Sequence, residues 1–366
     1  MLITAIETFP LRIPFKPGQA SAASGWGPGE RPAVDSLLVK VTTDQGLEGW
    51  GEALGFGAAA VTQRAIDDLI APLCVGRNAS RIASLMLDVQ KELQVFGRGG
   101  LVTHALSAVD IALWDIAGKA AGAPLHCLLG GGATHLASYA SLEAYDDPTV
   151  VRDRVRRVLE DGFNSLKLHE RQPVAIRAAR EAAGPGVDIM VDVNCAWTVS
   201  QVRGLAPELR DFRLKWLEEP VWPPENYEGL AELRATEEIP IAAGENVSTL
   251  MDFDRLLSAG SVDFVQPSPA KMGGVTELCK VFPVAALHNV TVMPHSFYDG
   301  PGLLAAIQVM AALGDVDGMI EWRYFDLEAR IYGDALSPEG GRIEVPQGPG
   351  LGIDPDPEVI RAYLRA

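Results

Sequence analysis

The sequence is poor in cysteine, in aromatic residues and in positive charge. Its 366 residues include 4 cysteines and 7% aromatic residues, and 31 lysines and arginines stand against 48 aspartates and glutamates, for a formal net charge of −17. This balance argues against nucleic-acid binding, because a phosphate backbone attracts a basic protein surface. It does not exclude a small anionic substrate, since a local cluster of cations or a bound metal ion can override the net charge.

The four cysteines lie far apart in the sequence and form no CxxC pair. We interpret them as buried free thiols of a protein in a reducing compartment. A nucleophilic thiolate needs an activating partner, and the sequence identifies none for Cys195.

Long apolar runs and a targeting segment are also lacking. No apolar run reaches the roughly 18 residues that a membrane helix needs. The first residues, "MLITAIETFPLRIPF", alternate like a β-strand and lack the basic start, apolar centre and small-residue cleavage site of a signal peptide. We therefore expect a cytoplasmic protein with no membrane association.

The beginning of the chain has an α+β pattern. Asp44 and Gly46 lie at the turn of a hairpin signal, "TTDQGLEG". The segment 16–32 is rich in Gly, Ser and Pro and is predicted to be a loop, within which Trp26 either packs as an anchor or closes over a ligand. Strand-like segments cover 2–15, 34–43 and 46–54.

Helical patterns follow these strands. The first is expected to stop at Pro72, and the second to begin after Ser80 as its N-cap. The third is a long amphipathic run that ends at Gly122, a usual C-terminal residue of a helix.

From about residue 135 short apolar strands alternate with helical patterns. Eight such units in sequence favour a parallel barrel over an open sheet. After residue 335 the chain becomes rich in Gly and Pro and is expected to fold back on the first domain. The expected strands lie near 136–142, 165–169, 189–194, 214–219, 240–245, 262–267, 290–295 and 319–322.

Polar residues stand at the ends of these strands, and barrel enzymes place their chemistry at the rim where the carboxyl ends of the strands meet. They include two basic residues on the second strand and a histidine on the seventh. In chain order they are Lys167, His169, Asp192, Asn194, Glu218, Glu219, Glu245, Gln266, Ser268, Lys271, His295 and Glu321.

Three of the acids form a regular series. Asp192, Glu218 and Glu245 are 26 and 27 residues apart (218 − 192 and 245 − 218), which is one strand–helix unit each time. Three carboxylates at one rim would repel one another unless a cation lies between them, and hard divalent ions such as Mg²⁺ take oxygen ligands. Only one of the neighbours Glu218 and Glu219 can face the rim directly, and the sequence does not decide which.

Lys167 and His169 are two residues apart on a strand and should point to the same face. Next to a metal-held carboxylate substrate, an imidazole suits abstraction of the α-proton, which gives an enediolate. The alternative is structural, with Lys167 paired to a nearby acid and His169 a satisfied polar residue. His295 comes from the opposite side of the barrel.

The motifs "GFNSLKLHE", "VDVN", "WLEEP", "AAGEN", "KMGGVTE", "MPHSF" and "IEW" together resemble the enolase superfamily, specifically the mandelate racemase / muconate-lactonizing group. The resemblance extends over nearly the whole chain, including "SAVDIALWDIAGKAAGAPLHCLLGG". It implies a modified (β/α)₇β TIM barrel over residues 129–334, an α+β capping domain over 1–128, and a C-terminal segment, 335–366, that packs back on the capping domain.

The resemblance also implies roles for single residues. It implies Mg²⁺ on Asp192, Glu218 and Glu245, substrate or metal-shell contacts for Asn194, and binding of the substrate carboxylate or enediolate by Glu321. The capping loop that contains Trp26 would shape specificity. Family members commonly assemble into homo-oligomers, and the same is expected here.

Two departures from the family pattern bear on the reaction. Lys-x-His replaces the frequent Lys-x-Lys, so His169 takes the place of the usual base. The Asp that supports the strand-seven His in racemase-like members is Ser268 here, which leaves a hydrogen bond from Ser268 as the support of His295. His295 is then a second base or a general acid, and Lys271 has a structural or electrostatic role.

These features predict an enzyme that abstracts the proton α to a carboxylate of an acid sugar or its lactone. Dehydration or cycloisomerisation to a 2-keto acid is favoured, because the rim is polar and aromatic residues are few. Racemisation or epimerisation of a 2-hydroxy acid or amino-acid derivative is the alternative. A non-catalytic binder of metal-bound carboxylates is the alternative outside enzymes.

Overall fold

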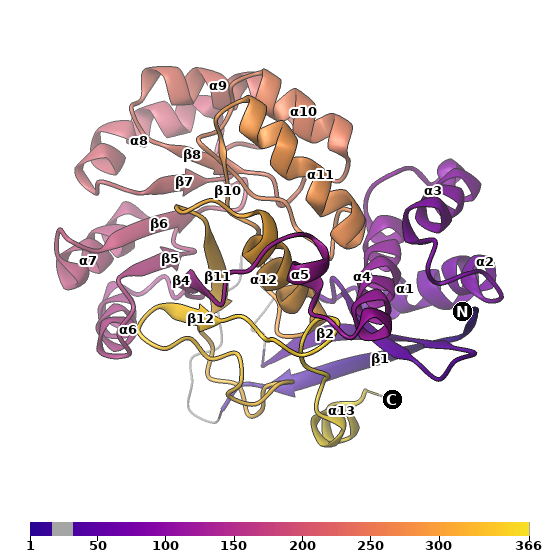
Figure 1. Ribbon diagram of the computed structural model, residues 1–366. Helices are drawn as coiled ribbons and strands as arrows, with labels where there is room; N and C mark the ends of the chain where they lie inside the picture. The colour runs from indigo at the N-terminus through magenta and orange to yellow at the C-terminus, as the bar shows by residue number, and fades with distance from the viewer. Residues whose placement is uncertain (17–31, 366) are drawn as a thin grey trace.

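The computed structural model describes residues 1–16 and 32–365, so Trp26 lies outside the described residues. The N-terminal region contains an antiparallel sheet in the order β1-β2-β3, with the hairpin turn at Gly46 (φ 77°), as predicted. The alternation of apolar residues buries one face of this sheet against helices (Figure 1). The strands are β1 (Ile3–Pro14), β2 (Ala33–Thr43) and β3 (Glu48–Ala53).

The helices of this region correct two predicted boundaries. The first helical run continues past Pro72 to Cys74, because a proline in the first turn of a new helix has no hydrogen bond to lose. Ser80 is not the N-cap of the next helix, which begins one residue later after Arg81. The elements are α1 (Ala59–Ala65), η1 (Ile66–Ile70), α2 (Ala71–Cys74), α3 (Ile82–Glu92), η2 (Gln94–Phe96), α4 (Leu101–Ala121) and α5 (Leu125–Leu128).

Helix α4 ends at Gly122 in the left-handed conformation (φ 64°), as predicted. Among the described residues it is the one helix long and apolar enough, by length and composition, to cross a membrane. In this fold 72% of its most apolar window is buried, since α4 packs between β3 and the barrel helix α11 (Gly274–Leu287). Its apolar character is therefore that of a core helix.

The eight barrel strands occur where the sequence predicts them, in the order β11-β4-β5-β6-β7-β8-β9-β10 of mostly parallel neighbours. Helices follow the first seven strands and cover the outside of the curled sheet (Figure 1), which makes the fold a (β/α)₇β barrel with an N-terminal α+β region. The strands are β4 (His135–Ser141), β5 (Ser165–Leu168), β6 (Asp188–Asp192), β7 (Trp216–Glu218), β8 (Ile241–Ala243), β9 (Phe264–Val265), β10 (Thr291–Val292) and β11 (Met319–Arg323).

Strands β10 and β11 stand at the two ends of the strand order and share no backbone ladder, but the side chain of Ser296 links them. The Ser296 hydroxyl, just beyond β10, donates to the carbonyl of Glu321 on β11 (2.9 Å) and accepts from its N–H (3.1 Å). The remaining helices are α6 (Pro148–Glu160), α7 (Pro173–Ala183), α8 (Val199–Asp211), α9 (Tyr227–Thr236), α10 (Leu250–Ser258), α12 (Pro301–Leu313) and α13 (Pro357–Tyr363).

The barrel interior is apolar at its lower level and charged above it. Tyr139, Met190, Trp216 and Met293 belong to a small buried cluster that fills the centre. Because side chains alternate along a strand, the next inward-facing residues are two positions further on: Ser141 and the predicted site residues Asp192, Glu218 and His295. The floor of the site is thus a packed apolar layer that keeps water away.

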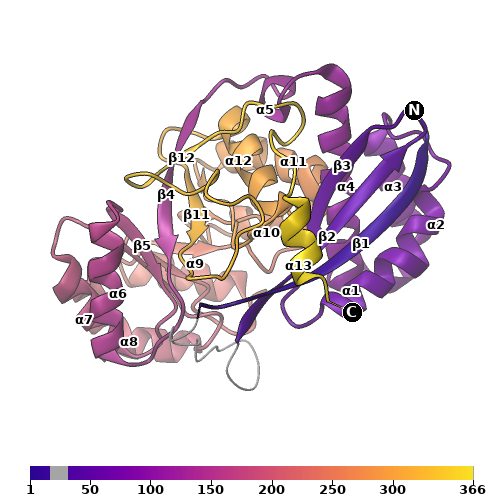
Figure 2. The same cartoon turned by 90° about the horizontal axis from the view of Figure 1, so that it is seen from below.

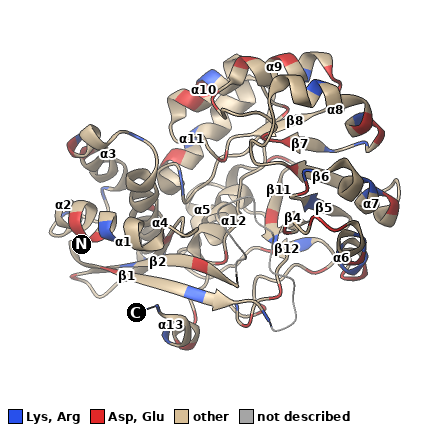
Figure 3. Ribbon diagram, turned by 180° about the vertical axis from the view of Figure 1, so that it is seen from behind, with Lys and Arg blue, Asp and Glu red and all other residues tan. Residues whose placement is uncertain are grey.

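The end of the chain contacts both parts of the molecule. β12 (Arg342–Glu344) pairs with β4 of the barrel, and α13 packs along β1 of the N-terminal sheet (Figure 2). The domain boundaries at 128 and 334 stay predictions. Acidic residues occur on helices of both the N-terminal region and the barrel (Figure 3).

Candidate active site

The three acids of the predicted metal site converge. One oxygen each of Asp192, Glu218 and Glu245 lies within 4.8 Å of the others, and Asp192 and Glu218 are buried. They come from the ends of β6, β7 and β8, which are hydrogen-bonded neighbours, so the rim brings them together as predicted. Glu218 is the member of its pair that groups with the other two acids; Glu219, with a positive φ of 41°, accepts a hydrogen bond from the side-chain amide of Asn246 (2.6 Å).

Lys167 is fully buried at the centre of the acids. Its ammonium lies 2.8 Å from Glu218 and 2.8 Å from Glu321, and 3.6 Å from Asp192. Burial alone would lower the pKa of Lys167, but the Glu218 and Glu321 carboxylates outweigh burial and hold it well above its ordinary value. Lys167 is therefore charged in this arrangement.

The acids outnumber the cations that face them. Burial raises the pKa of Glu218 well above its ordinary range and that of Glu219 to about 8, and neighbouring carboxylates add to both effects. Burial would also raise the pKa of Glu245, but Lys271 (3.5 Å) and His295 (3.1 Å) hold it well below its usual range. The site therefore has more carboxylates than neighbouring cations, and this excess of acidic groups favours the binding of a divalent cation.

His169 lies beyond the end of β5 and is held in one orientation. Its Nδ1 hydrogen-bonds to the carbonyl of Leu142, and its Nε2 lies 3.4 Å from Asp192. Because a carbonyl only accepts, Nδ1 of His169 is the donor in this hydrogen bond, and Nε2 is the nitrogen that faces the Asp192 carboxylate. His169 and Lys167 thus face the same place, as their spacing predicts.

His295 lies on the side of the carboxylates opposite His169. Its Nε2 is 3.1 Å from Glu245, and its Nδ1 is 3.0 Å from the Ser268 hydroxyl. Ser268 therefore holds His295 by a hydrogen bond, as the sequence suggested. Lys271 contacts Glu245 and the side-chain carbonyl of Asn246 (3.2 Å).

The two remaining substrate-binding candidates also border the carboxylates. Asn194, in the left-handed region (φ 48°), donates its backbone N–H to Asp192 (2.8 Å). Glu321 accepts hydrogen bonds from the Ser141 hydroxyl (2.8 Å) and the backbone N–H of Ser296 (3.3 Å). Their predicted roles toward substrate stay predictions, as does that of Trp26.

Sequence reasoning missed an aromatic wall beside the two histidines. The ring of Phe297 is 5.5 Å from His169 and 6.3 Å from His295, and it stacks on Phe56 of the N-terminal region (6.1 Å). The guanidinium carbon of Arg323 lies 4.3 Å from the centre of the Phe297 ring. The available signal was the "HSFYD" motif, which continues past the end of β10 into the site.

The residues present fit a magnesium ion. The donor set is three carboxylates, which is the hard oxygen chemistry that Mg²⁺ prefers. Gln266, fully buried on the same inner face, has neither side-chain oxygen nor nitrogen hydrogen-bonded within the described part of the chain. Buried amides are normally satisfied, so this orphan amide indicates a further polar group in the site.

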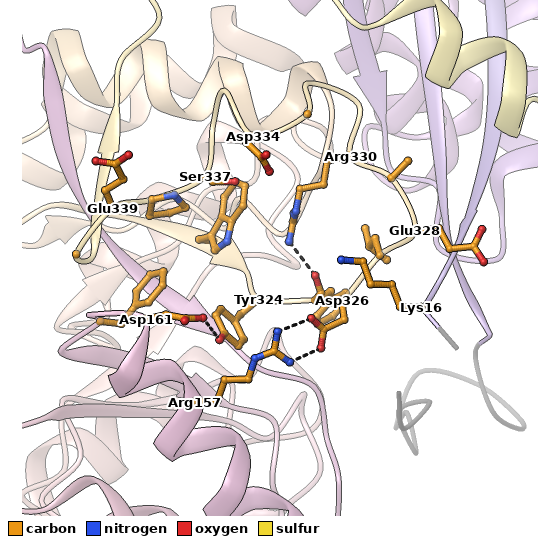
Figure 4. Close-up of a pocket in the computed structure, with 18 residues that line it drawn as sticks. Lys16, Arg157, Asp161, Tyr324, Asp326, Glu328, Arg330, Asp334, Ser337 and Glu339 are labelled. Atoms are coloured by element: carbon orange, nitrogen blue, oxygen red, sulfur yellow. Dashed lines mark hydrogen bonds and ion pairs between the residues drawn. The ribbon is translucent and has the colours of Figure 1, made fainter. Parts of the chain in front are cut away.

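A cavity of about 710 Å³ lies elsewhere, outside the barrel between α6 and the segment that follows β11 (Figure 4). Its wall includes the ion pair of Arg157 with Asp326 (2.7 Å) and a hydrogen bond from Tyr324 to Asp161. None of the predicted site residues within the described ranges lines it. The cavity therefore has no part in the chemistry of the carboxylates.

The sequence matches two family descriptions, the mandelate racemase / muconate lactonizing enzyme N-terminal domain over residues 30–130 and the enolase C-terminal domain-like family over residues 150–359. The chain belongs to this family of the enolase superfamily. It is an enzyme of the lyase or isomerase class, as its relatives are.

Three comparisons describe its position in the family. D-galactarolactone cycloisomerase of Agrobacterium fabrum is 32% identical over 351 residues, covering 89% of this chain and 90% of that protein. Arabinonate dehydratase of Saccharolobus solfataricus is 29% identical and covers 99% of both chains. The structure of a racemase from Streptomyces coelicolor with bound magnesium superimposes with a TM-score of 0.87 at 27% identity over 100% of both chains.

Proposed function

We propose that this enzyme catalyses the Mg²⁺-dependent abstraction of the proton α to a carboxylate in an acid sugar or its lactone, followed by dehydration or cycloisomerisation to a 2-keto acid. The observation that carries the proposal is the placement of two imidazoles on opposite sides of a carboxylate triad. Relatives with the same architecture are named for acid-sugar dehydration and lactone cycloisomerisation.

Asp192, Glu218 and Glu245 would hold the metal ion. When bound, the ion supplies Lewis-acid stabilisation of the negative charge that develops on the substrate carboxylate as the α-proton leaves. Lys167, charged and buried, adds a fixed positive charge at the same place, and Glu321 is positioned beside it. The apolar floor excludes water, which strengthens these electrostatic interactions.

His169 takes the α-proton in this proposal. Its Nε2 carries the lone pair because Nδ1 donates to Leu142, so the ring needs no reorientation before it acts. His295 lies on the other side and contacts the departing group. The Phe297 ring lies near both imidazoles and gives this side of the site an apolar surface.

The test is a substrate screen in D₂O with Mg²⁺, followed by NMR. It covers aldonic and aldaric acids and their lactones, and it measures deuterium at the α-carbon and new products. A 2-keto acid from an open-chain acid identifies a dehydratase, and a ring-opened 2-keto acid from a lactone identifies a cycloisomerase. Exchange with inversion and no loss of substrate would identify a racemase or epimerase instead. Turnover of N-acyl amino acids or dipeptides, with none of any sugar acid, would refute the proposal.

Assembly and location are separate proposals. We expect a homo-oligomer in the cytoplasm that has no nucleic-acid or membrane partner. Size-exclusion chromatography with light scattering measures the assembly, and cell fractionation measures the location.

A further inference from the structure

The segment between β10 and α12, residues 293–300, carries both His295 and Phe297 into the site and has no regular secondary structure. Its position therefore depends on contacts with side chains of other elements. Ser296 ties it to β11, as described above, and Arg323, the last residue of β11, holds it further along.

Arg323 holds this segment at two points. Its Nη1 donates to the carboxylate of Asp299 (2.5 Å), and its Nη2 donates to the backbone carbonyl of Phe297. All three residues are buried, with exposed fractions of 3% for Arg323, 6% for Asp299 and 2% for Phe297. Because both donors belong to one rigid planar group, the two hydrogen bonds fix the direction of the segment as well as its distance from β11.

The same guanidinium also lies against aromatic rings. Its carbon is 4.3 Å from the ring centre of Phe297, 5.4 Å from that of Phe325 and 5.5 Å from that of Phe56. The Phe297 ring is stacked on Phe56 (6.1 Å, 5° between the planes) and meets Phe325 edge-on (5.3 Å, 87°). Attraction between a cation and a ring is stronger when both are desolvated, so these contacts hold the Phe297 ring in one orientation.

We propose that Arg323 is a positioning residue for the reaction, acting through Phe297. It fixes the ring of Phe297, whose centre is 5.5 Å from that of His169 and 6.3 Å from that of His295, as the wall that places the substrate beside the two imidazoles. This inference rests on the proposed function. The hydrogen bonds that Arg323 makes within the described ranges go to Asp299 and Phe297 and not to the three acids of the metal site.

A simpler role for Arg323 would be to neutralise Asp299, and Arg330 separates the two roles. Arg330 pairs with the other oxygen of Asp299 (3.2 Å), but its guanidinium carbon lies over the ring of Trp322 (4.5 Å). The two arginines thus share the charge of Asp299, while the contact with Phe297 belongs to Arg323. A lysine keeps the charge, but its ammonium is a point charge that cannot stack flat on a ring while it donates to two fixed acceptors.

The first test compares lysine substitutions of the two arginines. Arg323→Lys should lower kcat for α-proton exchange in D₂O by about ten- to a hundredfold, the size expected when reacting groups are misplaced by about 1 Å. Mg²⁺ affinity by calorimetric titration should be unchanged. Arg330→Lys is the matched control and should exchange at the wild-type rate. Rescue of Arg323 by lysine, or equal losses in the two variants, would overturn the inference.

A double-mutant cycle tests whether Arg323 acts through the ring. Phe297→Leu should itself lower kcat, and Arg323→Lys should cause no further loss in the Phe297→Leu background. Losses that multiply in the double variant would show that Arg323 acts independently of Phe297, which would contradict the proposal.

Fluorine NMR of protein labelled with fluorophenylalanine gives a readout that needs no turnover. The Phe297 signal is assigned with Phe297→Leu, and it should shift or broaden in Arg323→Lys and stay in place in Arg330→Lys. Asp299→Asn, which keeps both side chains and weakens the anchor of Arg323, should move the same signal, so the test does not depend on the folding of one variant. A Phe297 signal that stays in place in Arg323→Lys and Asp299→Asn would refute the positioning role. If the wild type exchanges no acid sugar or lactone, the proposed function fails, and the fluorine spectra still decide whether Arg323 fixes Phe297.

Discussion

The buried carboxyl of Glu52 should make the unfolding free energy fall as pH rises from 5 to 8. Glu52 is 2% exposed and extends from β3 to the N-terminus of α12, where it accepts hydrogen bonds from the backbone N–H groups of Gly300 (3.1 Å) and Gly302 (2.9 Å). Burial raises its pKa from 4.5 to about 7; the Gly302 N–H and the Arg323 guanidinium oppose the rise, and Asp299 adds to it.

The sign follows from which state holds the proton. Between pH 4.5 and 7 the folded protein keeps the Glu52 proton and the unfolded chain has lost it, so raising the pH through this window favours unfolding. A difference of about 2.5 units corresponds to about 3 kcal/mol in total, of which about 2.5 kcal/mol is lost between pH 5 and pH 8. Above pH 8 the contribution is constant.

Urea denaturation at a series of pH values tests this reasoning. Glu52→Gln keeps an oxygen that can accept both N–H groups and cannot ionise, so the unfolding free energy of the variant should lose about 2.5 kcal/mol less than that of the wild type from pH 5 to pH 8. Glu92→Gln, at an exposed position of α3, is the matched control and should follow the wild type. Parallel pH profiles for wild type and Glu52→Gln would refute the reasoning.

Four further predictions concern the site and the scaffold. Glu245→Gln should weaken Mg²⁺ binding by roughly tenfold or more in calorimetric titration, because a charged oxygen ligand is lost; equal affinity would remove Glu245 from the metal site. His169→Ala should lower α-proton exchange by about 10²–10⁴-fold with Mg²⁺ affinity retained, and unchanged exchange by NMR would exclude it as the base. Asp110, whose pKa burial raises to about 7 while it accepts from the backbone N–H of Thr276 (2.9 Å), should behave like Glu52, so Asp110→Asn should flatten the same pH profile. Thr198→Ala removes the N-cap of α8 and should cost about 1 kcal/mol in urea denaturation, with kinetics unchanged.

Much of the fold could be predicted, because the periodic spacing of apolar residues and the polar residues at the strand ends can be recognised in the sequence. The helix from Leu101 to Ala121 ends at its predicted glycine, and all eight barrel strands occur at their predicted places. The errors at Pro72 and Ser80 are local: proline is tolerated in a first helical turn, and several polar residues compete for one N-cap. The 26- and 27-residue spacing of the acids predicted their convergence because one strand–helix unit separates neighbouring strand ends.

Other features depend on residues that are distant in sequence. The small fraction of aromatic residues suggested a site without an aromatic wall, yet Phe56 and Phe297, from different parts of the chain, stack beside the histidines. The sequence did not indicate that Glu52 and Asp110 are buried helix-capping acids. Each accepts a backbone N–H group at the start of a helix that is distant in sequence, and no local pattern marks such an acid.

The sequence by itself determined the order of the elements, the barrel class and the set of polar residues at its rim, since these follow from patterns that repeat over a few residues. Only the tertiary structure decided that Glu218 and not Glu219 groups with Asp192 and Glu245, and that the Leu142 carbonyl and the Ser268 hydroxyl hold His169 and His295 through their Nδ1 atoms. The physical reason is that a side chain's direction and the proton position on an imidazole are set by its hydrogen-bond partners. Those partners come from neighbouring strands and loops, and only the folded chain brings them within reach.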